Sequence, residues 1–458
     1  MRYYLAIDIG ASSGRHMLCS LQNNQIYLEE IYRFENHVEL KNGHYYWNID
    51  YLFGEVVAGI KECVKHNKIP TTLGIDTWAV DYVLLDELGH RIDDVYAYRD
   101  NRVDSFIKPD KIEELYMKTG VQYQKFNTIY QLASDDELRK TRTLDFLMIP
   151  DYLNYLLTGK KVNEYTNMST TQLLDIQTSK LSKELLDFCQ TDVEIFQDIV
   201  MPGTSLGSLS KDMRKVIGAD IEVIVPCTHD TGSAYMAAIE DKSIILSSGT
   251  WSLLGIETMQ PIVTLESMNA NFTNEGGYQQ RYRFLKNIMG LWIIQEVSRN
   301  LDEKYSFAKL VELARQDQFA GIFDVNDERF LKPESMIFEI KQYFQERHET
   351  PPQTVGQIAS CVYHSLAYGY KKAIEELEMI TKQTYPVINI IGGGCQNQLL
   401  NEMIAEMTGK KVVAGPVEAT ALGNILAQLI QQKVVNDLCE GRALIKKSFE
   451  MKEYKVIR

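Results

Sequence analysis

Two short turns rich in Gly and Ser follow apolar, strand-like segments at distant places in the chain. The first covers residues Ala11, Ser12, Ser13, Gly14 and Arg15, and the second is Ser247-Ser248-Gly249-Thr250. Small side chains let backbone N–H groups approach a ligand, and successive N–H groups form anion-binding concavities. Ser hydroxyls and the Arg15 guanidinium add donors suited to phosphate. One such turn is as easily a tight β-hairpin, but the matched pair indicates that a nucleotide's phosphate chain is held by both.

Two carboxylates stand where phosphoryl transfer would use them. Asp8 ends the first predicted strand directly before the first turn, and it could hold Mg²⁺ through water or cap local N–H groups. Asp230 lies between the strand-like 222–225 and a small-residue, helix-like segment, 234–239. An ionised carboxylate there could accept a proton from a substrate hydroxyl. The local pattern also fits a plain helix N-cap, so both interpretations stay open.

Two further segments fit a ligand without requiring one. Asp76, at the end of a predicted strand, with Trp78 and Asp81 would suit a sugar, although the local pattern favours a hairpin with a core Trp. Gly392-Gly393-Gly394 separates a strand from a helix and would let adenine or ribose approach the backbone. A turn that needs glycine only for its geometry is the alternative.

Strand-like and amphipathic segments alternate along the chain, which predicts an α/β fold. The expected strands are Tyr3–Ile9, Thr72–Asp76, Tyr82–Leu85, Glu222–Val225, Ser243–Leu246 and Pro386–Ile391. The expected helices are Leu52–His66, Tyr130–Lys140, Val355–Met379 and Gln398–Thr408.

The two matched strand–turn–strand segments also suggest two domains built on one plan. We place the boundary near residue 241, giving domains 1–241 and 242–458. Any two Gly/Ser hairpins look alike, so the pattern by itself leaves duplication open.

Composition excludes several classes of protein. The 458 residues carry 48 Lys and Arg against 62 Asp and Glu, a net charge of −14, which disfavours binding to nucleic acid or to anionic membranes. No apolar stretch is long enough for a transmembrane helix, and the start of the chain lacks the apolar region of a secretory signal. Seven cysteines without C-x-x-C spacing suit reduced thiols, so we expect a cytoplasmic protein. The P-loop and the G-x-G-x-x-G fingerprint are absent.

Taken in order, these pieces resemble the FGGY carbohydrate kinases of the sugar kinase/actin/Hsp70 ATPase superfamily. The strings that carry the resemblance, which covers essentially the whole chain, are Asp8–Arg15, Gly74–Asp81, His229–Ala234, Ser247–Leu253, Phe272–Gly277, Leu285–Trp292 and Gly392–Asn397. The resemblance implies two ribonuclease-H-like (actin-like ATPase) domains with an interdomain cleft. It also implies MgATP-dependent phosphorylation of L-rhamnulose at O1, giving L-rhamnulose 1-phosphate in L-rhamnose catabolism.

The resemblance assigns roles residue by residue. Asp230 is the expected proton acceptor, and the expected sugar contacts are Ala79, His229, Asp230, Thr231 and Asn287. The expected ATP contacts are Ala11, Ser12, Ser13, Gly14, Arg15, Thr250, Gln295 and Gly393. Asp8 is the expected Mg²⁺ ligand, and Ala79 departs from the family, which usually has Gly there.

Several alternatives remain at this stage. The sugar could be another ketose such as L-fuculose or xylulose, because only residues such as Trp78, Ala79 and Asn287 would discriminate between ketoses. The chain could also be a structural actin-like ATPase without a sugar, or a nucleotide-binding regulator without turnover. We expect a small ketose and ATP as partners, no nucleic acid, no membrane, and a monomer or weak homodimer.

Overall fold

The structure is a computed structural model that describes residues 2–106 and 109–455. Two compact units divide the chain, and they are interleaved in sequence. Unit 1 comprises the residues up to Ala237, then Glu257–Phe284 and Ala419–Ser448. Unit 2 comprises Ala238–Ile256, Leu285–Glu418 and the residues from Phe449 onward. The division at residue 241 stays a prediction about the sequence, since the compact units exchange segments on both sides of it.

Helices and strands of unit 1 alternate, as the sequence predicts. Its strands are β1 Tyr3–Ile9, β2 Ser13–Gln22, β3 Gln25–Glu35, β4 Val38–Lys41, β5 His44–Trp47, β6 Thr72–Thr77, β7 Tyr82–Leu85, β8 Val95–Tyr96, β9 Asp145–Met148, β10 Asn163–Glu164, β11 Leu174–Asp175, β12 Lys180–Leu181, β13 Ile199–Val200, β14 Ser205–Ser208, β15 Glu222–Ile224 and β18 Phe272–Gly276. Its helices are α1 Ile49–Lys65, α2 Ile112–Thr119, α3 Thr128–Ala133, α4 Glu137–Arg142, α5 Ile149–Thr158, α6 Tyr165–Met168, α7 Lys183–Phe188, α8 Lys211–Ile217, α9 Asp230–Met236, α10 Leu265–Asn269, α16 Ala419–Gln431 and α17 Leu438–Ser448.

Unit 2 continues the alternation. It contains the strands β16 Ile244–Ser248, β20 Val387–Ile391, β21 Lys411–Ala414 and β22 Lys452–Tyr454, together with parts of β17 Trp251–Thr258 and β19 Tyr282–Met289. Its helices are α11 Trp292–Asn300, α12 Phe307–Gln316, α13 Met336–Glu346, α14 Val355–Thr381 and α15 Gln398–Thr408. The predicted α/β class is therefore confirmed in both units.

The main sheets of the two units share one plan. The main sheet of unit 1 has the order β14-β15-β6-β1-β2-β3, and the seven-stranded sheet that contains the strands of unit 2 has the order β22-β21-β20-β16-β17-β19-β18. In each, a central strand pairs antiparallel with the next strand in sequence and parallel with a later one: β1 with β2 and β6, and β16 with β17 and β20. The two Gly/Ser turns join β1 to β2 and β16 to β17, so both are hairpins at equivalent places. This shared topology supports the duplication that the two turns suggest.

One predicted helix is wrong. Residues 130–140 form two short helices, α3 and α4, rather than one. The second begins at a new N-cap, because the Asp136 side chain accepts a hydrogen bond from the Arg139 N–H at 2.7 Å. Apart from the helix-like segment 234–239, the other predicted elements occur with bounds shifted by at most three residues, and Tyr3–Ile9, Tyr82–Leu85 and Gln398–Thr408 match in full.

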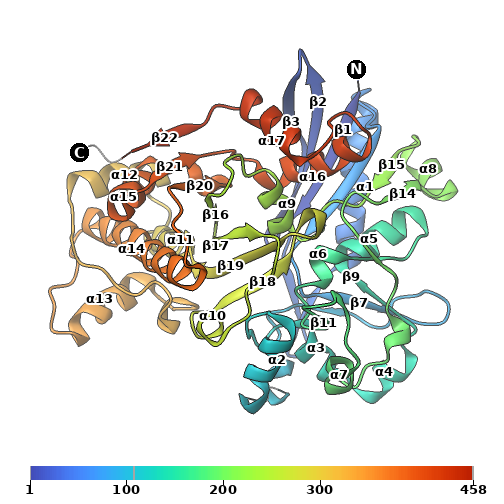
Figure 1. The fold of residues 1–458 in the computed structure, drawn as a ribbon, viewed down its shortest axis with the longest axis horizontal. Coiled ribbons are helices and arrows are strands. Elements are labelled where there is room, and N and C mark those ends of the chain that lie inside the picture. The colour runs from blue at the N-terminus through green and yellow to red at the C-terminus, as the bar shows by residue number, and fades with distance from the viewer. Residues whose placement is uncertain (1, 107–108, 456–458) are drawn as a thin grey trace. The chain divides into compact units, whose positions relative to one another are not determined.

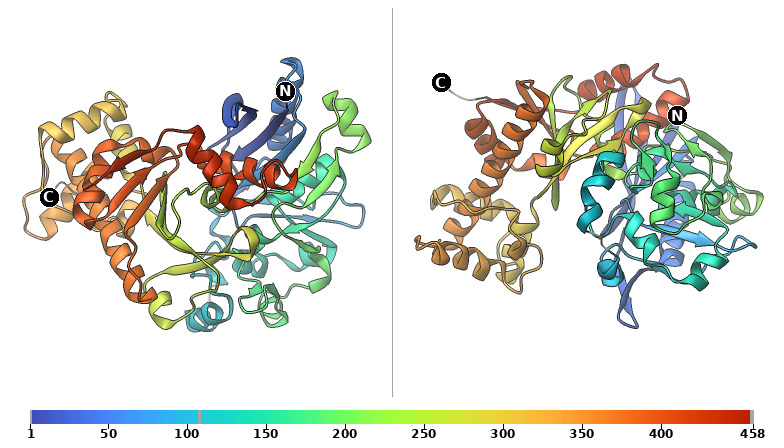
Figure 2. Two further views of the ribbon diagram at one scale, coloured as in Figure 1. Left: turned by 45° about the horizontal axis from the view of Figure 1, so that its top comes forward. Right: turned by 60° about the horizontal axis from the view of Figure 1, so that its bottom comes forward.

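Helix α16, late in the sequence, packs inside unit 1. Figure 1 shows it in red beside the blue strands β1 and β2 and the green helix α9, and Figure 2 shows the same neighbourhood of red helices and blue strands from two other sides. The α9–α16 approach is so close that a Cβ on Gly423 would lie 1.7 Å from the Ser233 carbonyl oxygen. Within the described residues, no helix combines the length and apolar character needed to cross a bilayer.

We expect Gly423→Ala to destabilise the protein by more than about 3 kcal/mol, because backbone rather than a flexible side chain fills the space. Gly54→Ala is the matched control, since Gly54 lies inside α1 with nothing within 4 Å of its added Cβ. That change should stabilise by about 0.5–1 kcal/mol through helix propensity. Calorimetric unfolding of both variants checks the pair, and equal effects would contradict the packing argument.

Candidate active site

Two aspartates lie side by side at the ends of the central strands of unit 1. Asp8 on β1 and Asp76 on β6 are partners in the parallel register. Asp76 is fully buried; its Oδ2 accepts a hydrogen bond from Asn424 Nδ2 at 2.6 Å, and its Oδ1 has no hydrogen-bond partner among the described residues. Burial, with the neighbouring Asp8 charge, raises the pKa of Asp76 well above its usual value. A pair of carboxylates so close favours a cation or a proton between them.

The first turn presents its N–H groups. Its carbonyls are occupied: Asn36 donates from its side chain to Gly10 O at 2.8 Å and from its backbone to Ser12 O at 3.0 Å. Within the described part of the chain, no hydrogen bond takes the backbone N–H of Ala11 or Ser12. The turn can therefore offer donors to an anion, as the sequence predicts.

The last two turn residues have local partners. Gly14 is buried, and a Cβ there would lie 2.1 Å from the Phe34 ring, so packing alone explains this glycine. Arg15 Nη2 forms an ion pair with Asp8 Oδ2 at 2.9 Å across the hairpin. Their roles at ATP stay predictions, since a local contact already accounts for each residue.

Asp230 opens helix α9 with one oxygen available. The end of β6 lies against the segment before α9, because Thr77 N–H donates to Thr228 O at 2.9 Å. Asp230 Oδ1 accepts from the Thr231 N–H at 2.5 Å and the Thr231 hydroxyl at 3.0 Å, while no hydrogen bond within residues 2–106 and 109–455 takes Oδ2. Its side chain is 33% exposed. The arrangement leaves Oδ2 free to accept a proton from a substrate hydroxyl.

The N-cap interpretation of Asp230 is wrong. The N-cap is His229, and Asp230 is the first residue of the helix. The helix begins four residues earlier than the predicted segment 234–239, which moves Asp230 from the cap into the first turn.

The carboxylate of Asp81 is hydrogen-bonded to other groups of the protein. It is buried, and its Oδ2 accepts from the indole N–H groups of Trp47 at 2.6 Å and Trp78 at 2.9 Å and from the Tyr98 N–H at 3.1 Å. Gln131 Nε2 donates to Oδ1 at 3.0 Å. Trp78 stacks on Trp47 with ring centroids 4.2 Å apart. Trp78 is therefore a core residue, as the alternative interpretation predicts, but there is no hairpin here, because β6 pairs with β1 and β15 and β7 pairs with β9. The suggestion that Asp81 accepts from a sugar is wrong, because four protein donors already use its lone pairs.

The turn that carries Ala79 is held in a strained conformation. Val80 has φ of +69°, which is rare for a β-branched residue. Its carbonyl accepts from the Thr128 hydroxyl at 2.7 Å and from Gln131 Nε2 at 3.2 Å, both on α3. Ala79 itself is partly exposed beside it. Helix α3 thus fixes the backbone that is expected to face the sugar.

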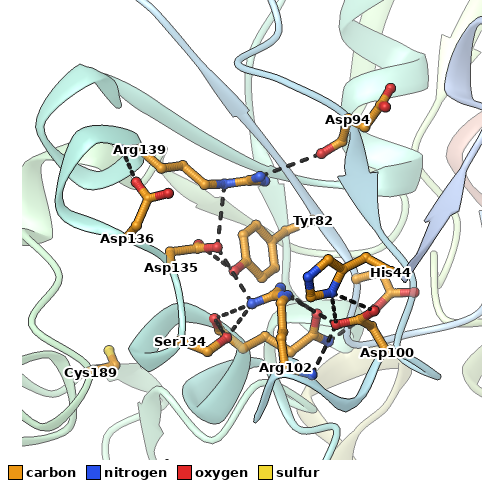
Figure 3. A network of polar contacts seen from close by, with 12 residues as sticks. His44, Tyr82, Asp94, Asp100, Arg102, Ser134, Asp135, Asp136, Arg139 and Cys189 are labelled. Carbon is orange, nitrogen blue, oxygen red and sulfur yellow. Dashed lines mark hydrogen bonds and ion pairs between the residues drawn. The ribbon is translucent and has the colours of Figure 1, made fainter. Parts of the chain in front are cut away.

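A polar network anchors α3 in turn (Figure 3). Arg102 donates to Gln131 O at 2.8 Å and pairs with Asp135, which also accepts from the Tyr82 hydroxyl at 2.6 Å. A cavity of about 280 Å³ adjoins this network. Its lining is Tyr46, Asp93, Asp94, Tyr96, Ser134, Asp135, Asp136 and Arg139. None of these is a predicted site residue, and the network acts as a scaffold.

Unit 2 brings together residues predicted to bind ATP. Thr250 in the second turn donates from its hydroxyl to Gln295 Oε1 on α11 at 3.4 Å. The start of α11 rests on the turn, because Leu291 N–H donates to Gly249 O at 2.9 Å and Trp292 N–H to Thr250 O at 3.1 Å. A Cβ on Gly290 would lie 2.7 Å from Gly249 O, which explains the glycine before this helix.

The three glycines of Gly392-Gly393-Gly394 have different surroundings. Gly392 has φ of +81°, and a Cβ on Gly394 would lie 2.1 Å from Ser248 Oγ at the end of β16. A Cβ on Gly393 would meet nothing within 4 Å. The protein itself therefore requires the outer two glycines, whereas Gly393 faces open space where a nucleotide could approach.

Asn287 also belongs to unit 2. It lies on β19, and its side-chain Oδ1 is buried without a hydrogen-bond partner among the described residues. An orphaned buried acceptor is costly unless a ligand or water satisfies it. This supports the expected substrate contact, while Ala79, His229, Asp230 and Thr231 belong to unit 1.

Sequence reasoning missed three supporting groups: Asn36, which holds the first turn; Asn424, which holds Asp76; and the Glu275–Arg283 pair beside His229. Glu275 lies inside one of the strings that carry the resemblance, which was the available signal. Among residues 2–106 and 109–455, no three His, Cys, Asp or Glu side chains converge as a ready metal site.

Models of the FGGY family of carbohydrate kinases match both parts of the chain. The N-terminal-domain model matches residues 3–237 and the C-terminal-domain model residues 244–431. The chain belongs to the FGGY family of carbohydrate kinases, and it is a sugar kinase that uses ATP as co-substrate.

The chain is also similar to individual curated relatives and to solved structures. The chain is 49% identical to a rhamnulokinase of Halalkalibacterium halodurans, covering 99% of both chains, and 44% identical to one of Bacillus subtilis, covering 98% of this chain and 95% of the relative. Its fold is similar to a xylulose kinase of Lactobacillus acidophilus (TM-score 0.83, 16% identity, 99% and 94% covered). It is also similar to a glycerol kinase of Plasmodium falciparum (TM-score 0.79, 15% identity, 99% and 94% covered).

The free energy of unfolding should depend on pH through the titration of Asp81. Burial raises its pKa to about 6, against the opposing effect of its four hydrogen bonds. The folded state therefore holds a proton that the unfolded chain releases near pH 4. This contribution to stability is complete below about pH 4 and is lost as the pH rises through 6.

Asp81→Asn removes this titration. Its free energy of unfolding, measured by denaturant titration from pH 4 to 7, should fall less steeply than that of wild type, by up to about 1.4 kcal/mol per pH unit. The variant should also be less stable at every pH, because one donor now faces an amide N–H₂. Parallel pH profiles for the two proteins would contradict the raised pKa.

The glycine triplet gives a second prediction. Gly393→Ala should leave thermal stability unchanged and raise the KM for ATP by about tenfold, because the methyl enters only the open space. Gly394→Ala should lower the melting temperature through its clash with Ser248. Steady-state kinetics with calorimetry separates the two, and an unchanged KM in Gly393→Ala would remove this residue from the ATP site.

Proposed function

We propose that the chain transfers the γ-phosphoryl group of ATP to O1 of L-rhamnulose, giving L-rhamnulose 1-phosphate. The observation that carries the substrate is the set of seven relatives named rhamnulokinase, at 40–49% identity over nearly the whole chain. The fold neighbours are named as kinases of xylulose, gluconate and glycerol at 11–17% identity, so they carry the fold alone.

Asp230 is the proposed proton acceptor. Its Oδ1 is fixed by Thr231, and its unbonded Oδ2 can accept the proton of the sugar O1 hydroxyl as that oxygen attacks phosphorus. Ala79, His229, Thr231 and Asn287 would position the ketose so that O1 meets Oδ2. The proposed ATP contacts Thr250, Gln295 and Gly393 belong to unit 2.

The residues at the ends of β1 and β6 fit a hydrated Mg²⁺. Asp8 offers a carboxylate, and Asp76 Oδ1 is a buried acceptor without a partner among the described residues. Mg²⁺ at phosphates is usually held by one or two carboxylates with water and phosphate oxygens. When bound, the ion would neutralise phosphate charge. Arg15 would then be released from Asp8 to contact phosphate.

The nucleotide side of the proposal rests on the two turns and the glycine triplet. The free N–H groups of Ala11 and Ser12, with Ser13, Gly14 and Arg15, would bind phosphate oxygens. Thr250 with its partner Gln295 and the open face of Gly393 would bind the rest of ATP.

The test measures ADP release from MgATP with L-rhamnulose, L-fuculose, L-xylulose, D-xylulose, glycerol and no sugar. A strong preference for L-rhamnulose is expected. Preference for another ketose would leave the proposed role of Asp230 intact but change the proposed substrate. Ala79→Gly would then be the first variant to make. ADP release that ignores every sugar would contradict the kinase proposal and favour a structural ATPase.

Asp230→Asn is the matched variant for the base. It keeps the shape of the side chain but cannot accept the proton, so turnover should fall by about 10²–10⁴-fold while ATP binding, followed by calorimetry, is retained. Asp212→Asn is the control, because Asp212 is an exposed surface aspartate that pairs with Lys215. A near-wild-type rate in Asp230→Asn would remove Asp230 from this role.

A further inference from the structure

A buried ion pair stands directly behind His229. Arg283 is fully buried, and its Nη1 lies 3.0 Å from Glu275 Oε2. Arg283 Nη2 lies 3.1 Å from His229 Nδ1, and Glu275 Oε2 lies 3.3 Å from the same nitrogen. On the other side of the ring, His229 Nε2 lies 3.5 Å from Asp230 Oδ1. Glu275, Arg283, His229 and Asp230 thus form a chain of side-chain contacts that ends at Asp230, the proposed base.

The pair is rigidly held within unit 1. Glu275 lies on β18 and Arg283 on the first part of β19, and Arg283 Nε donates to Gly276 O at 2.9 Å. Burial raises the pKa of Glu275, but the Arg283 guanidinium and the contact with His229 outweigh burial and hold the pKa below its usual value. The ionised carboxylate is thus neutralised by the adjacent guanidinium, away from water.

The partner of Nδ1 decides the tautomer of His229. A guanidinium has only donors and cannot accept a hydrogen bond. Two groups approach His229 Nδ1: Arg283 Nη2 forms a hydrogen bond with it at 3.1 Å, whereas Glu275 Oε2, at 3.3 Å, has no hydrogen-bond partner among the described residues. In the hydrogen bond with Arg283 the nitrogen Nδ1 is the acceptor, which places the ring proton on Nε2. The assignment follows from the partners, as it must where hydrogens are not seen.

We propose that Arg283, with Glu275 as its counter-ion, is a positioning residue that fixes His229 as the Nε2–H tautomer and aims that N–H beside Asp230. This inference rests on the proposed function only for the identity of the sugar. The geometry of the four side chains does not depend on it. In this form His229 can donate to a ketose oxygen, and Asp230 remains the one proton acceptor of the pair. With the proton on Nδ1, the Nε2 lone pair would instead face the Asp230 carboxylate and compete for the same hydroxyl proton.

A purely structural role is the competing explanation. Arg283 also packs near Gly232, whose added Cβ would lie 3.6 Å from the guanidinium carbon. If packing were its whole purpose, any replacement that kept the fold would leave the His229 tautomer unchanged. The test therefore reads the tautomer itself.

The first measurement uses the full chain labelled with ¹⁵N-histidine, without sugar or ATP. The His229 signal is the one lost in His229→Gln. Two-dimensional ¹H–¹⁵N spectra should show Nε2 protonated and Nδ1 unprotonated in wild type. In Arg283→Lys, which keeps the charge but loses the planar fork, the signal should move toward a mixture of tautomers. A wild-type signal with the proton on Nδ1 would overturn the proposal.

A double variant guards against misfolding. Arg283→Met alone strands a buried carboxylate, whereas Arg283→Met with Glu275→Met replaces the whole pair by apolar groups, which folds are known to tolerate. Calorimetry establishes that the double variant is folded. It should show the mixture of tautomers, and retention of the pure Nε2–H form would overturn the proposal.

Kinetics then link the tautomer to turnover with the best sugar of the panel. Arg283→Lys should lower kcat/KM by about tenfold. In the His229→Gln background the same change should cost no more than about twofold, since Arg283 acts through His229. Equal losses in both backgrounds would overturn the positioning role. Failure of L-rhamnulose as substrate would leave the spectra unaffected, so the two proposals fail separately.

Discussion

Two amide side chains on α16 complete the hydrogen bonding of the central strands in unit 1. Asn424 Nδ2 donates to Asp76 Oδ2 at 2.6 Å and to Gly74 O at 3.1 Å, and Gln428 Nε2 donates to Leu5 O at 2.9 Å. All these groups are buried. An unsatisfied buried group costs about 1–3 kcal/mol, so the position of Asp76, and with it the neighbouring Asp8, depends on a helix more than 340 residues further along the chain.

This dependence accounts for the interleaved units. The central strands of the two units pair equivalently, β16 with β17 and β20 in unit 2 as β1 with β2 and β6 in unit 1. The chain nevertheless returns α16 to unit 1, where Gly423 lets it approach α9, the helix that begins with Asp230. One late helix thus supports both Asp76 and Asp230. The domain boundary predicted from the two hairpins could not include this late segment in unit 1, because the hairpin residues carry no information about where α16 packs.

The sequence predicted what short-range chemistry decides. Apolar strands ending in a Gly/Ser turn identified both hairpins, and the helix Gln398–Thr408 was bounded by an Asn cap and Gly409. The helix break at 134–136 was missed because the apolar period runs through it while a new Asp cap interrupts it. The role of Asp81 was left open between a sugar contact and a structural position for a different reason. Its donors Trp47 and Gln131 lie 34 and 50 residues away, and no local pattern shows that they converge.

The carboxylates of unit 1 are distinguished by their remaining hydrogen-bond capacity rather than by their sequence context. Asp81 is saturated by four protein donors and can only hold structure. Asp76 retains one buried oxygen, which suits a cation or proton shared with Asp8. Asp230 alone among these three combines an oxygen fixed by Thr231, an unbonded oxygen and partial exposure. A general base needs a lone pair that the protein leaves unused and holds in place, and among these three carboxylates this requirement favours Asp230 as the proposed base.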